Sequence, residues 1–161
     1  MEVNANIRIE SLPERHFACV NHTGPYMGDF ALFGRLFQQA TSWLQARNLM
    51  GGSSEAITIY YDDPQNTPPE QHRISVGFTV AEAVQGDGEV EIKLLPAGKY
   101  LVASFELHPH EYPAAWGAVG KYVQENDVEL SGEMMYESYK NDPKTHPEGK
   151  QLVDICASLK A

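Results

Sequence analysis

Hydrophobic and polar positions alternate along several short segments of the chain, which is the pattern of strands with one buried face. The clearest segment is 74–80, where Ile74, Val76, Phe78 and Val80 fall on one side of an extended chain. Shorter alternations occur at 7–9, 57–61 and 134–139. These segments predict β-strands, and their β-branched and aromatic residues favour the same assignment.

Two longer segments have helical spacing instead. Between Asp29 and Arg47 apolar residues recur at 30, 33, 36, 37, 40, 43 and 44, which predicts one core-facing helix. Asp29 can cap the start of this helix, and glycines follow its end. A second helix is predicted to open near Pro113 and to direct Trp116, Val119 and Val123 inward. Its glycines, at 117 and 120, indicate close approach of another backbone or simple tolerance.

The whole pattern occurs twice. Residues of the first half match residues 83 positions later up to the end of the helix, and 79 positions later beyond it. Matched pairs include Ile9 with Ile92, Phe33 with Trp116, Thr58 with Glu137, and Val76 with Ile155. Each half therefore predicts strand, strand, helix, strand, strand, and a constant shift of this kind indicates an internal repeat.

This repeat predicts an α+β fold in which two pseudo-symmetric βαββ repeats form a curved antiparallel sheet with two helices and a cleft at the seam. We expect a single domain over 1–161, with repeat halves at about 5–80 and 89–159 and a linker at 81–88. One amphipathic helix in each half can cover only one face of its sheet, so the junction of the halves is the expected place for a binding site.

Composition narrows the possible functions. Twelve Lys and Arg stand against 22 Asp and Glu, and the formal net charge of −10 argues against direct binding of nucleic acid. No segment approaches the ~20 apolar residues that a membrane span needs, and no signal peptide is evident, so we expect a cytoplasmic protein. Cys19 and Cys156 are far apart, and we expect both to be reduced core residues.

Glu137 is the sharpest candidate for chemistry, because it lies in the middle of an aromatic-rich strand. One interpretation is a glutamate facing solvent on the open side of the sheet. A second is a single charge in an aromatic cleft, suited to an organic cation through the negative faces of the rings. A third is a general base whose pKa is raised by burial.

Other chemistry is weakly indicated. His108 and His110 could share a metal ion, but only Glu111 offers a third ligand nearby, and we predict neither a metal nor another cofactor. No Gly-x-Ser-x-Gly sequence and no phosphate-binding loop is present. We therefore expect a binding protein more than an enzyme.

Four motifs resemble the DNA gyrase inhibitory protein family. They are Tyr60-Tyr-Asp-Asp-Pro-Gln-Asn-Thr-Pro-Pro-Glu-Gln-His-Arg73, Met135-Tyr-Glu-Ser-Tyr-Lys-Asn-Asp-Pro143, His22-Thr-Gly-Pro-Tyr26 and Leu95-Pro-Ala-Gly-Lys-Tyr100. They occur in the family's order and span most of the chain. The wider superfamily includes the effector-binding domains of multidrug-responsive and AraC-type regulators.

The resemblance implies two βαββ halves with a ligand cleft that contains Glu137. It further implies that aromatic residues of such clefts correspond to Trp116, Tyr139, Tyr60 and Tyr26. It implies DNA gyrase as a partner and a role in resistance to gyrase-directed toxins and in stress response. No DNA-binding segment is expected. Two alternatives remain: a sensor or sequestering protein for amphipathic cations, and a hydrolase in which Glu137 activates water with help from Tyr139.

Overall fold

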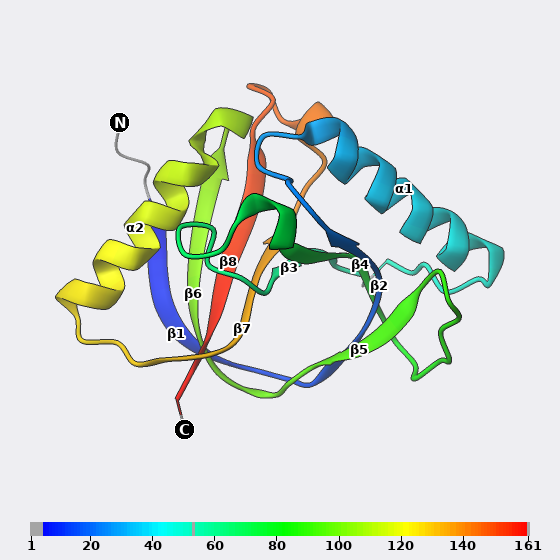
Figure 1. Ribbon diagram of the computed structural model, residues 1–161, viewed down its shortest axis with the longest axis horizontal. Helices are drawn as coiled ribbons and strands as arrows, with labels where there is room; N and C mark the ends of the chain where they lie inside the picture. The colour runs from blue at the N-terminus through cyan, green and yellow to red at the C-terminus, as the bar shows by residue number, and fades with distance from the viewer. Residues whose placement is uncertain (1–4, 53, 161) are drawn as a thin grey trace. The chain divides into compact units, whose positions relative to one another are not determined.

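The computed structural model describes residues 5–52 and 54–160, which separate into two compact units (Figure 1). Unit 1 contains the chain up to Pro13 and from Ala97 onward, and unit 2 contains Glu14–Pro96. The described residues form eight strands and two α-helices, and each unit has four strands and one helix. Neighbouring strands within each unit are antiparallel, which confirms the predicted α+β class.

Unit 2 is a four-stranded sheet covered on one face by helix α1. Its elements are β2 (Arg15–Thr23), α1 (Phe30–Ala46), β3 (Ala56–Tyr60), β4 (Arg73–Val80) and β5 (Glu91–Leu95), with the strands in the order β3-β4-β2-β5. The helix begins where the sequence predicts, because an Asp29 carboxylate oxygen accepts the Leu32 N–H at 3.0 Å. The buried positions of α1, from Leu32 to Leu44, pack on alternate residues of β2 and β4.

Unit 1 repeats this arrangement with helix α2. Its elements are β1 (Ala5–Leu12), β6 (Gly98–Leu107), α2 (Tyr112–Glu125), β7 (Leu130–Tyr139) and β8 (Gln151–Leu159), with the strands in the order β1-β6-β8-β7. Ala115 and Val119 of α2 pack against the apolar faces of β6 and β8. No helix among the described residues is both long enough and apolar enough to cross a membrane.

Each unit is built from both halves of the sequence. Strand β1, from the first half, pairs with β6 of the second half. Strand β5, from the second half, pairs with β2 of the first half. The first strand of each half is thus an edge strand in the unit that contains the other half's helix.

The register of the strands is the same in the two units at the shifts of 83 and 79 residues that the sequence indicates. Three facing pairs of unit 1 each have an equivalent in unit 2. Ile9–Leu101 corresponds to Ile92–Ala18, Val102–Cys156 to Cys19–Gly77, and Glu137–Ile155 to Thr58–Val76. A strand that slips by one residue turns every side chain to the other face, so equal registers place matched residues on equivalent faces.

Gly77 in β4 is required by close packing of two strands. A Cβ atom at this position would lie 1.9 Å from the carbonyl oxygen of Ala18 and 2.8 Å from the Cα atom of Cys19 in β2. By contrast, Cβ atoms at Gly117 and Gly120 of α2 would meet no atom within 4 Å. The helix glycines are therefore tolerated rather than required.

We predict opposite effects of one substitution at these two kinds of site. Gly77→Ala should lower the free energy of unfolding by about 1–3 kcal/mol because it overpacks β2 against β4. Gly120→Ala should raise it by about 0.5–1 kcal/mol because alanine favours a helix interior. Urea unfolding of both variants measures the difference, and equal stabilities would contradict the packing argument.

Candidate functional site

Glu137 lies in strand β7 with only 3% of its surface exposed. The interpretation of this residue as a solvent-facing glutamate is therefore wrong. An ionised carboxylate removed from water is strongly destabilising unless hydrogen-bond donors replace the lost solvent. The structure supplies such donors within unit 1.

Two aromatic side chains donate hydrogen bonds to this carboxylate. The Nε1–H group of Trp116, on α2, donates to Oε2 at 2.7 Å. The hydroxyl of Tyr139, two residues along β7, donates to Oε1 at 2.6 Å. Both bonds are short, as expected for a charged acceptor, and both donors are neutral, so they hold the carboxylate without adding positive charge. The structure thus brings Glu137, Trp116 and Tyr139 together, and their role in ligand binding stays a prediction.

Tyr112 belongs to the same cluster and was not predicted. It is the first residue of α2, four positions before Trp116, so the two side chains share a helix face. Burial raises the pKa of the Tyr112 hydroxyl, and the negative charge of Glu137 raises it further. The helical spacing from Trp116 was the signal that could have identified Tyr112.

Tyr26 and Tyr60 lie together in unit 2. Their ring centroids are 5.5 Å apart at an angle of 45°. Phe33 of α1 meets Tyr26 edge to face, with centroids 6.2 Å apart. Phe33 and Tyr60 are the repeat counterparts of Trp116 and Tyr139, whereas the counterpart of Glu137 is Thr58, which is fully buried. Equivalent positions thus carry a buried carboxylate in unit 1 and a buried hydroxyl in unit 2.

His72 fixes the position of Tyr26. Its ring packs on the Tyr26 ring with centroids 5.4 Å apart. The Nε2 atom of His72 lies 2.8 Å from the carbonyl oxygen of Thr67, which can only accept, so we assign the proton to Nε2. The carbonyl oxygen of His72 in turn accepts the N–H of Gly24 at 2.8 Å. These contacts order the His22–Tyr26 motif just before α1.

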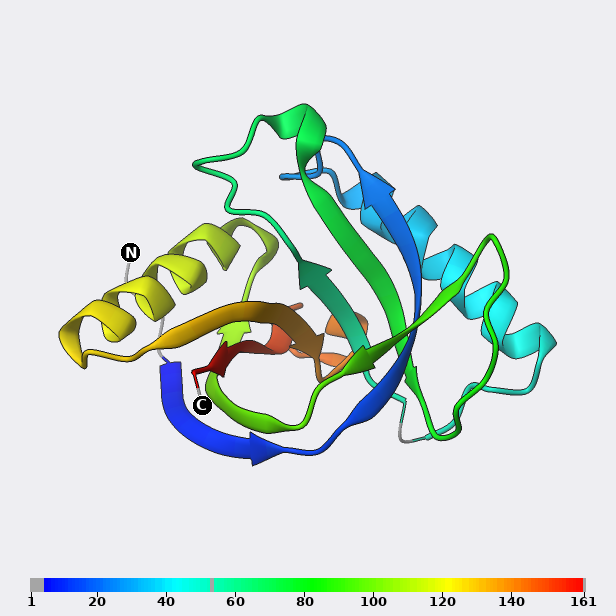
Figure 2. The ribbon, with the colours of Figure 1, turned by 60° about the horizontal axis from the view of Figure 1, so that its bottom comes forward.

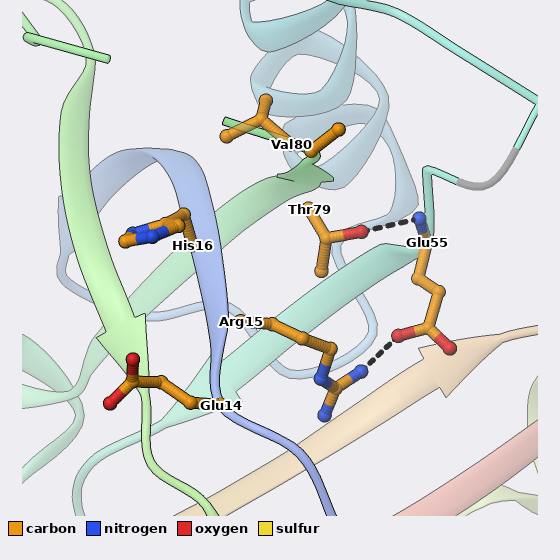
Figure 3. A pocket seen from close by; sticks show the side chains of 7 residues that line it. Glu14, Arg15, His16, Glu55, Thr79 and Val80 are labelled. Atoms are coloured by element: carbon orange, nitrogen blue, oxygen red, sulfur yellow. Dashed lines mark hydrogen bonds and ion pairs between the residues drawn. The ribbon is translucent and has the colours of Figure 1, made fainter. Parts of the chain in front are cut away.

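A pocket of about 310 Å³ opens elsewhere in unit 2 (Figure 3). Its lining includes Glu14, Arg15, His16, Glu55, Thr79 and Val80. Arg15 forms an ion pair with Glu55, whose backbone N–H donates to the Thr79 hydroxyl at 2.9 Å (Figure 3). None of the predicted site residues lines this pocket.

The predicted metal-binding candidates and the two cysteines have structural roles. The rings of His108 and His110 stack with centroids 5.7 Å apart, and the Glu111 carboxylate accepts the backbone N–H of His108 at 2.8 Å. No group of three His, Cys, Asp or Glu residues that could hold a metal ion occurs within the described ranges. Cys19 and Cys156 are buried and unbridged as predicted, and burial raises the pKa of Cys19 to about 11.

A polar group held among aromatic side chains on an antiparallel α+β framework is typical of small-molecule-binding domains. The comparisons with known proteins agree. Residues 5–160 match the family model of the GyrI-like small molecule binding domain, and the chain belongs to this family. The resemblance to gyrase inhibitory proteins predicted from the four motifs is confirmed.

Individual relatives cover nearly the whole chain. A protein named DNA gyrase inhibitor from Pectobacterium carotovorum subsp. carotovorum (strain PC1) is 24% identical over 159 residues, covering 97% of this chain and 98% of its own. The crystal structure of the EcmrR C-terminal domain is similar with a TM-score of 0.80 at 14% identity, covering 97% of this chain and 98% of that one. The structure of SAV2435 bound to tetraphenylphosphonium has a TM-score of 0.63 at 11% identity, covering 97% and 94%. At these identities the two structures establish the fold alone.

We predict that the Tyr139 hydroxyl stabilises the protein through Glu137. Tyr139→Phe should lower the free energy of unfolding by about 1–2 kcal/mol, the value of a partly buried hydrogen bond to a charged acceptor. Tyr122→Phe, which removes a hydroxyl that is not bonded to Glu137, should change it little. Chemical denaturation compares the two variants, and an equal loss in both would contradict the assignment.

Proposed function

We propose that the unit 1 site binds small amphipathic organic cations, with Glu137 as the counter-charge. The observation that carries the proposal is the buried Glu137 carboxylate, which accepts hydrogen bonds from Trp116 and Tyr139 and whose negative charge raises the pKa of Tyr112. This arrangement concentrates one negative charge among three aromatic side chains.

The physical chemistry of the cluster favours a cation with a diffuse charge. Away from water a carboxylate attracts a cation several times more strongly than it does in solution. The negative faces of Trp and Tyr rings add to this attraction, as they do in the recognition of quaternary ammonium groups. A bulky organic cation gives up little hydration on entering such a site, whereas a compact ammonium or metal ion gives up much more. Apolar substituents around the charge would then pack on the rings.

Tyr26 and Tyr60 remain predicted ligand contacts. Their rings lie together in unit 2, where Tyr26 is buried and packs on His72. Individual substitution of the two tyrosines by alanine tests their roles separately from that of Glu137.

Tetraphenylphosphonium, which is bound in the structure of SAV2435, is a suitable probe. We expect the purified protein to bind it and Glu137→Gln to weaken binding by about 10- to 100-fold, the equivalent of a charge-assisted contact. Glu133→Gln, on an exposed position of the same strand, is the matched control and should bind normally. Calorimetric titration measures all three proteins, after circular dichroism has shown that they are folded.

A neutral probe separates charge from shape. Triphenylphosphine oxide carries similar aryl groups without the positive charge, so Glu137→Gln should affect its binding little. Equal affinity of native protein and Glu137→Gln for tetraphenylphosphonium would exclude the ion pair and with it the proposed ligand class.

Inhibition of DNA gyrase is the second function we propose, supported by the near-complete coverage of a relative that bears this name. The net charge of −10 is compatible with docking on a basic, DNA-handling surface. We expect the purified protein to inhibit supercoiling by gyrase in a concentration-dependent and salt-sensitive manner. A supercoiling assay measures this, and full activity of gyrase in a molar excess of the protein would contradict the proposal.

A further inference from the structure

Strand β1 leaves one of its edges open. It is the outermost strand of the unit 1 sheet, β6 pairs with one edge, and no strand of the described chain pairs with the other. Figure 2 shows the long curve of this strand. An open edge presents backbone N–H and C=O groups that can pair with another strand.

The side chains of β1 form an apolar centre flanked by opposite charges. Ile9 is 55% exposed, which is unusual for an isoleucine in a strand. Arg8 and Glu10 lie on either side of it and point to the opposite face, with their charged groups 3.2 Å apart. Arg8 also donates to the Ser104 hydroxyl at 2.9 Å, and its guanidinium has donors left for another carboxylate.

We propose that β1 pairs with β1 of a second copy of this chain, antiparallel and about a two-fold axis at Ile9. In this register Ile9 faces Ile9 of the other copy. Arg8 of each copy faces Glu10 of the other, so the ion pair occurs twice. Cross-strand apolar and ionic pairs of this kind are the stabilising unit of antiparallel sheets.

The charges select this register over its neighbours. Facing residues of an antiparallel pair lie on the same side of the sheet. The axis of pairing can therefore move from Ile9 only to Arg8 or Glu10 if each residue is to keep its face. The next register in one direction places Arg8 opposite Arg8, and the next in the other direction places Glu10 opposite Glu10. Like charges directly opposite each other are destabilising. Only the register centred on Ile9 is complementary.

Strand β5, the outer strand of unit 2, is less suited to this role. It has five residues where β1 has eight. Its charged side chains are separated by Ile92 and bind residues of their own unit: Lys93 donates to the Tyr61 hydroxyl and Glu91 accepts from the Asn21 amide, both at 2.6 Å. Pairing of β1 with β5 would also leave open edges and continue into a fibre, whereas pairing of β1 with itself closes a dimer.

Cross-linking tests both the interface and its register. Ile9→Cys should form a disulfide dimer on mild oxidation, because facing Cα atoms in an antiparallel pair lie about 4.5–5.5 Å apart, within the range of a disulfide. The two native cysteines are buried and should not interfere. Ser11→Cys, exposed on the same strand, faces Ile7 of the other copy and should remain monomeric. Cross-linking of Leu94→Cys in β5 in place of Ile9→Cys would overturn the proposal.

Charge reversal tests the ion pairs in the otherwise native chain. An interface of a single strand pair should give a weak dimer whose population depends on concentration. Glu10→Lys and Arg8→Glu should each raise the dissociation constant by about tenfold or more, and the double variant Arg8→Glu/Glu10→Arg should restore it. Sedimentation velocity over a concentration series measures all four proteins. A native chain that stays monomeric up to roughly 1 mM, or a double variant as weak as the singles, would refute the proposal.

Discussion

The buried carboxylate of Glu137 places the strongest constraint on unit 1. Its desolvation is offset by hydrogen bonds from Trp116 and Tyr139, and the first of these comes from a helix 21 residues earlier in the chain. Helix α2 must therefore keep one distance from β7 and one rotation about its own axis, because otherwise the carboxylate loses the donor on Trp116. The packing of Ala115 and Val119 on β6 and β8 fixes the same two quantities. Stability and ligand recognition thus depend on one placement of α2, and a substitution that shifts this helix should affect both.

The repeat explains how a single framework carries two different chemistries. Registers are equal in the two units, so Thr58 occupies in unit 2 the position that Glu137 occupies in unit 1. Phe33 likewise replaces Trp116, and a phenyl ring has no N–H to donate. The loss of the donor accompanies the loss of the acceptor, as expected if the indole and the carboxylate are required as a pair. Unit 2 keeps aromatic rings at the positions of Trp116 and Tyr139, as Phe33 and Tyr60, without the charge. The asymmetry is chemical and the scaffold is shared.

Sequence patterns predicted the elements and their faces, but not their partners. Periodicity and the Asp29 cap located α1 to within a residue at each end. Alternation cannot tell which strand lies next to which, so the pairing of β1 with β6 and of β5 with β2 had no signal in a single chain. The burial of Glu137 was left open for the same reason: a glutamate in a strand indicates exposure until its donors are known. Family motifs favoured the functional interpretation, and helical spacing from Trp116 would have added Tyr112.

Polar networks explain why the exchanged strands hold their places as edges. In unit 2 the direction of the network can be worked out, because the Ser75 hydroxyl donates to Asn21 and must accept from Tyr61, whose oxygen accepts from Lys93. Asn21 donates to Glu91, so the chain of bonds begins and ends on β5.

In unit 1 Arg8 of β1 donates to Ser104, which donates to Asp154 at 2.6 Å. Ser104 and Asp154 are the repeat counterparts of Asn21 and Ser75. Each edge strand is therefore held at one register by polar groups on the helix-free face as well as by backbone pairing. The same specificity holds Arg8, Ile9 and Glu10 of β1 in a fixed order along its outer edge, which is what pairing with a second strand in one register requires.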